Sequence, residues 1–367
     1  MQTLSSFKIR GAVPAGRFFS LISAVLIGIA APAGLGLASA HAQAGAVLRV
    51  GTTNSSSDVG FFIADKKGYF KQEGISVAFI AFDSAAKMVA PLGVGQLDVG
   101  GGAPSAGLYN AIARGINIKI VADKGSSPPG YGYNPLLVRK DLVDSGRVKG
   151  FQDLKGLRVA VPATGTSPTV MLNEALKKGG LSYSDVTVVT MGFPQHVMAL
   201  QNKAVDASIT TEPSVTAAVN SGAAVRFAGN DEFYPYHQVA VVLYGGAFIK
   251  DNPDMAKKFM RAYIKAVRDY NDALKDWKLA GPKADEIISI LTEYTSIKDP
   301  NVYKSIVAHG TNPDGKVNEA SLKKDFQFYK EQGLIEGNVS VGQALDNSFV
   351  EAALKEMGPY QPKTLKK

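Results

Sequence analysis

The stretch VAVPATGTSPTVMLNEAL, residues 159–176, joins an apolar run to a helical pattern through a knot of glycine and small hydroxyl residues. The apolar run predicts a buried strand, and the apolar spacing after the knot predicts a helix that runs to Lys178. Ser167 is a favourable N-cap and Pro168 favours the first helical position, so we expect the helix to begin here. The knot is either a plain helix cap or a ligand loop, and its clustered hydroxyls favour the ligand loop.

The knot lacks the residues of a nucleotide-binding loop. A P-loop needs a Gly-Lys pair followed by Ser or Thr, and Gly165 is followed by no such pair. The triple glycine at 100–102 does not complete a dinucleotide fingerprint either, because Ser105 stands where the third glycine belongs. We expect these glycines to let the backbone turn tightly into a helix opened by Pro104.

Strands and helices alternate on both sides of the knot, and the same order occurs twice. LRV at 48–50 recurs at 157–159, and Leu92 with Asp98 recurs as Leu200 with Asp206. The alternation predicts parallel sheets covered by helices, and the near-constant offset predicts two α/β lobes built alike. The strands are expected at 48–53, 74–82, 97–101 and 116–123 in the first copy, and at 157–163, 186–191, 205–211 and 224–229 in the second.

Two segments rich in Gly, Pro and Tyr are typical of crossings between lobes: GSSPPGYGYNPLLV (125–138) and FYPYHQVAVVLYGG (233–246). We therefore expect lobe I at 45–134, lobe II at 135–235, and a return to lobe I with C-terminal helices over 236–367. In open α/β sheets ligands bind beyond the carboxyl ends of the strands, so six strand-to-helix loops are expected to face a cleft between the lobes.

The chain is predicted to be helical from Pro253 onward. One apolar stripe at helical spacing supports this; its members are Phe259, Tyr263, Val267, Tyr270, Leu274 and Trp277. Further helices are expected at 282–295, 318–332 and 346–356.

The N-terminus has the pattern of a secretory signal peptide. Lys8, Arg10 and Arg17 precede an uncharged apolar stretch that runs from Phe18 to Leu37 and ends in small residues. We expect a signal peptide over residues 1–42 with cleavage between 40 and 44, and hence a periplasmic protein; the alternative is an uncleaved membrane anchor. Cleavage would remove three basic residues and no acidic ones, which lowers the formal charge from +8 to +5.

Composition excludes several chemistries. The 367 residues include no cysteine, so the chain has no thiol nucleophile, no cysteine-bound zinc and no iron-sulfur cluster. After the signal peptide the histidines are His196, His237 and His309, and none has another histidine at metal-ligand spacing. We expect no metal and no cofactor. The basic residues are scattered, so we expect no nucleic-acid partner.

Four motifs carry a resemblance to a known family. GYFKQEGISV (68–77), GQLDVGG (95–101), FQDLKGLRVAVPATGTS (151–167) and ALQNKAVDASITTEP (199–213) occur in this order. Together they resemble the nitrate/taurine/aliphatic-sulfonate type of ABC-transporter substrate-binding protein, which is similar to the thiamine-pyrimidine-precursor synthases.

The resemblance implies a two-lobed periplasmic-binding fold of type II that closes on a small molecule and delivers it to an ABC permease in the inner membrane. It assigns ligand loops at 54–56, at 164–167 and at 211–213. The eukaryotic pyrimidine-precursor synthases carry a cysteine-rich motif and the related desulfinases use a cysteine nucleophile, so the absence of cysteine argues against both activities.

The residues expected at the ligand come from these loops and their neighbours. They are Asn54, Ser55, Ser56, Ser84, Ser105, Thr164, Gly165, Thr166, Ser167, Gln195, His196, Thr211, Glu212 and Tyr236. Two roles stay open at this point: Glu212 either binds an amine or favours a helix start, and the crossing tyrosines 131, 133, 234 and 236 either stack on a planar ligand or only pack. A charged anion would depend on helix ends, hydroxyls and Lys87 or Lys124.

The expected function is that of a monomeric, non-catalytic solute receptor for an ABC importer, with a sulfonate, nitrate, pyrimidine-like or aromatic-acid ligand. The alternative is an exported enzyme of the same fold that acts on a small carboxylate, with Glu212 or His196 as acid or base.

Overall fold

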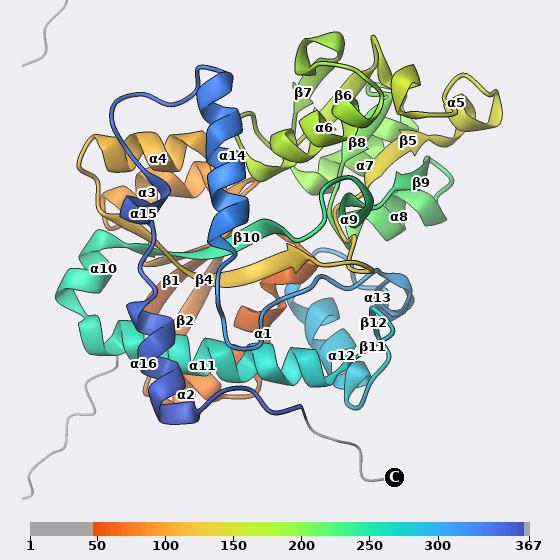
Figure 1. The fold of residues 1–367 in the computed structure, drawn as a ribbon. Helices are drawn as coiled ribbons and strands as arrows, with labels where there is room; N and C mark the ends of the chain where they lie inside the picture. The colour runs from red at the N-terminus through yellow and green to blue at the C-terminus, as the bar shows by residue number, and fades with distance from the viewer. Residues whose placement is uncertain (1–46, 363–367) are drawn as a thin grey trace, which may run out of the picture. The chain divides into compact units, whose positions relative to one another are not determined.

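Two mixed β-sheets with helices on their faces form the two lobes of the chain (Figure 1). The computed structural model describes residues 47–362, so the predicted signal peptide lies outside the described residues. The α/β class and the two lobes predicted from the alternating pattern are confirmed.

The sheet of lobe I has five strands within the described residues, in the order β2-β1-β3-β10-β4. They are β1 (Val47–Thr52), β2 (Ser76–Ala81), β3 (Val99–Gly102), β4 (Ile118–Ser127) and β10 (His237–Gly245).

The sheet of lobe II repeats this arrangement over residues 136–228, in the order β7-β6-β8-β5-β9. Its strands are β5 (Leu136–Arg139), β6 (Arg158–Val161), β7 (Thr187–Thr190), β8 (Ala207–Ile209) and β9 (Ala224–Ala228).

The prediction of purely parallel sheets was wrong for one strand in each lobe. β10 runs antiparallel to β3 and β4, and β5 runs antiparallel to β8 and β9. β5 begins at the end of the first crossing segment (125–138), and β10 lies within the second (233–246). A strand that arrives from the other lobe enters at the edge where its neighbours end, so it must run in the opposite direction.

The sequence repeat corresponds to a repeated ion pair. In lobe I the Arg49 backbone N–H and guanidinium donate to Asp98 at 2.8–2.9 Å, and in lobe II Arg158 donates to Asp206 at 2.9–3.0 Å. The register agrees, since Val50 lies opposite Val99 and Val159 lies opposite Ala207. The two lobes are thus built alike down to individual contacts.

Helices cover both faces of the first sheet (Figure 1). Neighbouring strand residues such as Ile120 and Val121 belong to different apolar cores, as expected when side chains alternate between two covered faces. The helical elements of this lobe before the first crossing are η1 (Ser56–Asp58), α1 (Val59–Lys66), α2 (Tyr69–Gln72), η2 (Ala85–Met88), α3 (Val89–Gly93) and α4 (Ala106–Ala113).

Lobe II contains the helix that was predicted to begin at residues 164–167. It is α6 (Ser167–Lys178), which packs on the second sheet. The other helical elements are α5 (Lys140–Asp144), η3 (Phe151–Leu154), η4 (Tyr183–Asp185), α7 (Phe193–Gln201), α8 (Ser214–Asn220) and α9 (Asn230–Phe233).

The C-terminal part is helical, as predicted, but the apolar stripe is shorter than expected. Phe259, Tyr263, Val267 and Tyr270 are buried on α11 (Pro253–Asp272). Leu274 and Trp277 lie beyond the helix end, in the hairpin β11–β12 (Leu274–Lys275 and Lys278–Leu279), and Trp277 is 53% exposed. The remaining helices are α10 (Gly246–Asp251), α12 (Ala284–Tyr294), α13 (Pro300–Ser305), α14 (Glu319–Glu331), α15 (Val341–Ala344) and α16 (Ser348–Met357).

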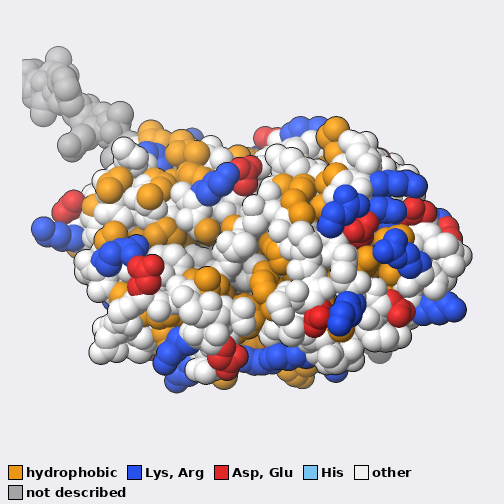
Figure 2. All heavy atoms as spheres, turned by 90° about the horizontal axis from the view of Figure 1, so that it is seen from above, with side chains coloured by type: hydrophobic (Ala, Val, Ile, Leu, Met, Phe, Trp, Pro, Cys, Tyr) orange, Lys and Arg blue, Asp and Glu red, His pale blue; other side chains and the backbone are white. Residues whose placement is uncertain are grey.

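Charged side chains on the surface occur in groups of mixed sign. On the face shown in Figure 2, basic and acidic side chains lie beside one another, and pairs such as Arg114 with Glu336 are within 3.0 Å. Within residues 47–362, none of the helices combines the length and the apolar character needed to span a bilayer.

Candidate ligand-binding site

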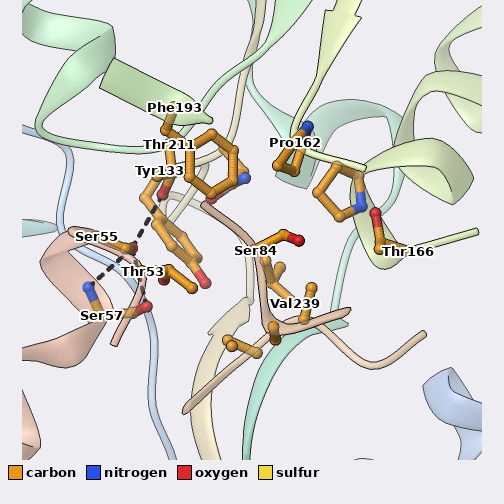
Figure 3. Close-up of a pocket in the computed structure, with 16 residues that line it drawn as sticks. Thr53, Ser55, Ser57, Ser84, Tyr133, Pro162, Thr166, Phe193, Thr211 and Val239 are labelled. Carbon is orange, nitrogen blue, oxygen red and sulfur yellow. Dashed lines mark hydrogen bonds between the residues drawn. The ribbon is translucent and has the colours of Figure 1, made fainter. Parts of the chain in front are cut away.

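A cavity lies where the loops of the two lobes meet (Figure 3). The space free of protein atoms is about 400 Å³ when the open mouth is included, of which about 30 Å³ is open to the centre of a water-sized sphere. All six strand-to-helix loops contribute to it, together with both crossings. The lining residues are Thr53, Ser55, Ser57, Ser84, Ala85, Gly102, Ala103, Tyr133, Asn134, Pro162, Thr166, Pro168, Phe193, Thr211, Val239 and Ala240.

The loop after β1 is held by a buried carboxylate. Asp58 accepts hydrogen bonds from the backbone N–H groups of Thr53 (3.1 Å) and Ser55 (2.9 Å), so the chain folds back into the short helix η1. Asn54 makes the turn with a φ of 54° and is half-buried outside the cavity lining. Ser55 reaches the cavity, whereas the buried Ser56 is not among its lining residues.

Behind this loop lies a fully buried ion pair. Lys124 Nζ is 2.9 Å from Asp58 Oδ1 and donates to Ser57 Oγ at 2.8 Å, and both charged side chains are 0% exposed. The lysine is therefore neutralised one layer behind the cavity wall. The other lysine considered, Lys87, is exposed and pairs with Asp83.

The knot at 164–167 forms a contact between the lobes. Thr166, and not Ser167, is the N-cap of α6, so the predicted cap was one residue too late. Ser105 and Thr166 form an antiparallel backbone bridge. Ala106 N–H donates to the Gly165 carbonyl at 2.8 Å, and Ser167 N–H donates to the Pro104 carbonyl at 3.3 Å. The starts of α4 and α6 are thus joined to each other, and of these loop residues only Thr166 lines the cavity.

Ser167 is turned toward the C-terminal helix α14. Its hydroxyl donates to Asp325 at 3.2 Å. The same carboxylate accepts from Tyr234 Oη at 2.8 Å and contacts His237 Nε2 at 2.8 Å. This buried cluster connects lobe II, the second crossing and α14, which explains why Ser167 is absent from the cavity wall.

The third loop of lobe II, residues 211–213, contacts lobe I at one end of the cavity. Thr211 Oγ1 lies 3.3 Å from Ser55 Oγ, and Ser56 N–H donates to the Glu212 carbonyl at 2.8 Å, so lobe I and lobe II are hydrogen-bonded here. Figure 3 shows Ser55 between Thr211 and Ser57, with all three at one end of the cavity.

The Glu212 side chain points away from the cavity. Its carboxylate accepts from Thr216 N–H (3.0 Å) at the start of α8 and from Val307 N–H (3.3 Å), with Arg226 3.8 Å away. Of its two predicted roles, the geometry matches the helix start. Burial raises the pKa of Glu212 to about 7.

His196 is buried inside lobe II. Its Nε2 lies 3.0 Å from the Met191 carbonyl and its Nδ1 lies 2.7 Å from Thr210 Oγ1. A carbonyl can only accept, so Nε2 carries the proton and Nδ1 accepts from the hydroxyl. Burial lowers the pKa of His196 to about 4, so the ring is neutral at physiological pH.

Three further predicted residues lie at the surface. Thr164 and Gln195 are exposed, and Thr164 borders a second, open depression beside Lys87 and Asp83. Tyr236 is 60% exposed, and its backbone is bonded to Ser127 and Asn318 in the second crossing. Of the expected ligand contacts, the cavity brings together Ser55, Ser84, Thr166 and Thr211.

Several lining residues were not on the predicted list. Tyr133 and Asn134 come from the first crossing, and Phe193 comes from the start of α7. The tyrosines of the crossings were considered as ligand contacts, but the sequence does not say which of them points into the cavity. Gly102 also lines the cavity. The expectation that the triple glycine forms a tight turn was wrong, since residues 100–102 are part of strand β3. Gly102 lies close to the next loop, because a Cβ at this position would be 2.8 Å from the Ala85 side chain.

Three buried polar atoms at the cavity lack a hydrogen-bond partner: Ser84 Oγ, Tyr133 Oη and Asn134 Oδ1. Tyr133 lies beside Ser57, but its hydroxyl makes no hydrogen bond of acceptable geometry. Buried polar groups are nearly always paired, so unpartnered atoms that converge on one cavity make it the candidate ligand site. Within residues 47–362, no cluster of His, Asp and Glu could hold a metal ion.

Solved structures share this fold. The nitrate-binding protein NrtA of Synechocystis PCC 6803 aligns with a TM-score of 0.70 at 14% identity, over 85% of this chain and 89% of that one. The alkanesulfonate-binding protein SsuA of Xanthomonas axonopodis pv. citri, bound to MOPS, aligns with a TM-score of 0.64 at 20% identity, over 82% of this chain and 98% of that one. The fold is therefore that of the periplasmic binding proteins of type II, as the resemblance implied.

The chain belongs to the NMT1/THI5-like family, whose model matches residues 55–273. A relative is 4-amino-5-hydroxymethyl-2-methylpyrimidine phosphate synthase THI11 of Saccharomyces cerevisiae, 29% identical over 231 residues, which are 59% of this chain and 64% of that protein. The chain spans 62–64% of the length of the curated relatives it matches.

Proposed function

We propose that this protein is a solute-binding receptor that captures a small molecule between its two lobes and delivers it to an ABC importer. The observation that carries the proposal is the cavity itself, at which residues of both lobes meet and three buried polar atoms lack partners. A ligand that pairs with these atoms would stabilise the closed arrangement of the lobes.

The site is proposed to consist of the lining residues Ser55, Ser84, Thr166 and Thr211 from the predicted list, with Tyr133 and Asn134 added. The ligand class named by the resemblance is a sulfonate, nitrate, a pyrimidine-like molecule or an aromatic acid. We also propose export to the periplasm through residues 1–42, a monomeric state, a permease partner, and lobe boundaries at 45–134, 135–235 and 236–367.

The enzyme alternative has less support, although a curated relative is named a synthase. None of the cavity-lining residues in the described part of the chain is a histidine, a carboxylate or a lysine, so the cavity wall offers no general acid or base of these types. Both residues considered for this role have other partners: His196 bonds Thr210, and Glu212 caps α8.

A thermal-shift screen of the purified protein against nitrate, sulfonates, aromatic acids and pyrimidines tests the proposal. A receptor is stabilised by its ligand and returns it unchanged on denaturation, as checked by chromatography. Conversion of the stabilising compound into a product would refute the receptor function.

A further inference from the structure

We infer that the cavity selects an uncharged, planar ligand with hydrogen-bonding groups and rejects sulfonates and nitrate. The inference rests on the proposed function, since it concerns the ligand of that same site. It follows from four observations: the charge of the wall, the state of the helix starts, the unpartnered polar atoms and the apolar side chains.

The wall of the cavity carries no charge. Its sixteen lining residues are Thr, Ser, Ala, Gly, Tyr, Asn, Pro, Phe and Val. The nearest buried cation named above, Lys124, is held 2.9 Å from Asp58 and cannot serve a second anion without leaving the first unpaired. An anion enclosed here would lose its hydration without gaining a counter-charge, which costs far more free energy than burial of a neutral molecule.

At two of the helix starts around the cavity, those of α6 and η1, the backbone N–H groups named below already have partners. At α6 the Ser167 N–H donates to Pro104, position 168 is a proline without an N–H, and the Thr169 N–H donates to the Thr166 carbonyl at 2.8 Å. At η1 the Ser56 N–H donates to Glu212 and the Ser57 N–H donates to Ser55 Oγ. Backbone N–H groups at helix starts are the usual substitute for a cation in anion binding, and here they hold the lobes and loops together.

The unpartnered atoms match a neutral ligand. Asn134 offers an amide oxygen, which requires an N–H or O–H donor on the ligand. The hydroxyls of Ser84 and Tyr133 can each donate or accept. Burial raises the pKa of Tyr133 well above its usual value, so this group stays a neutral phenol. A nitrate or a sulfonate presents only acceptors and would leave Asn134 Oδ1 unpaired.

Apolar side chains form much of the rest of the wall, and two of the lining residues, Tyr133 and Phe193, are aromatic. Phe193 and Pro162 lie on the lobe II side and Tyr133 and Val239 come from the crossings, as Figure 3 shows around Ser84. Aromatic rings pack favourably against another aromatic ring, in offset-stacked or edge-to-face arrangements. A single heteroaromatic ring or an aromatic amide therefore satisfies both the apolar wall and the three polar atoms.

Isothermal titration of the purified protein with a set of shape-matched probes tests the inference. The neutral probes are benzamide, uracil and cytosine; the anionic probes are benzoate, benzenesulfonate and nitrate. We expect at least one neutral probe to bind at least tenfold more tightly than every anion. Tyr133→Phe and Asn134→Leu should each weaken that binding at least fivefold, whereas Tyr131→Phe, a half-buried crossing residue outside the lining, should not.

Tighter binding of any anion would overturn the inference and leave the receptor function standing. Failure of every neutral probe at millimolar concentration would overturn it as well. Turnover of a bound probe would instead refute the proposed function, so the two failures are distinguishable.

Discussion

Ser105 of lobe I and Thr166 of lobe II pair their backbones in an antiparallel bridge between the lobes. The bridge brings the start of α4 against the start of α6 and is extended by the bond from Ala106 N–H to the Gly165 carbonyl (2.8 Å). Of these residues only Thr166 lines the cavity, so replacement of Ser105, Ala106 or Gly165 should alter ligand affinity indirectly, through the contact between the lobes.

Gly165→Val tests this contact between the lobes. Gly165 has a φ of 62°, and its missing Cβ would lie 3.3 Å from the Ala106 side chain across the bridge. A branched side chain should keep the lobes apart and weaken ligand binding about tenfold, which corresponds to about 1.4 kcal/mol. Titration calorimetry with the compound identified by thermal shift measures the change.

The matched control is Gly180→Val. Gly180 has a φ of 67°, but nothing lies within 4 Å of its added Cβ. Both variants should lose about 1–2 kcal/mol of stability from the left-handed backbone, and only Gly165→Val should lose affinity. Equal affinities in the two variants would show that the bridge does not govern closure.

Glu212 should make the protein less stable as the pH rises. Its pKa is raised by burial from 4.5 in the unfolded chain to about 7, so the folded state holds a proton that the unfolded state releases. Its contribution to stability is fully present below about pH 4.5 and is lost as the pH rises through about 7, by on the order of 3 kcal/mol. Urea unfolding at a series of pH values measures the slope.

Glu212→Gln should flatten this slope but not abolish it. Burial also raises the pKa of Asp123, to about 6, and that residue remains in the variant. The exposed Glu351→Gln on α16 is the control and should leave the slope unchanged. An unaltered pH dependence in Glu212→Gln would contradict the buried, protonated state of this side chain.

His196 should matter for stability and not for chemistry. His196→Ala removes two hydrogen bonds and leaves a cavity in lobe II, so we expect a loss of about 2–4 kcal/mol in the free energy of unfolding. The exposed neighbour Gln195→Ala should change it by less than about 0.5 kcal/mol. Chemical denaturation of both variants checks the prediction, and a stable His196→Ala would disprove the bonded geometry.

The buried ion pair predicts strong coupling between Lys124 and Asp58. Lys124→Met strands a buried carboxylate and Asp58→Asn strands a buried ammonium, so each should cost about 3–5 kcal/mol. The double variant should cost less than the sum, because neither charge is then left unpaired. Additive losses in a double-mutant cycle would mean that the pair does not interact.

The repeat in the sequence predicted much of the fold because it includes residues that form the same ion pair in both lobes, as well as the order of strands and helices. The recurrence of Asp98 as Asp206 marks the same carboxylate that bonds Arg49 in one lobe and Arg158 in the other. The antiparallel strands β5 and β10 escaped prediction because strand direction depends on where the chain enters the sheet, which apolar spacing does not record.

The candidate site was predicted at the level of loops and less well at the level of side chains. Sequence position identified Ser55 and Thr211 as loop residues, and the cavity brings them together. Sequence position did not predict where the side chains of Ser167 and Glu212 point. Ser167 bonds Asp325, which is 158 residues away, and Glu212 bonds the backbone of Val307. Side-chain direction is set by such distant partners, and a single sequence does not reveal them.

A crystal structure of the protein with the compound that stabilises it most is the most direct test of the proposed receptor function. We expect unaltered ligand between the lobes, within hydrogen-bond distance of Ser84, Tyr133 and Asn134. Ligand bound outside this cavity, or a converted product within it, would contradict this function.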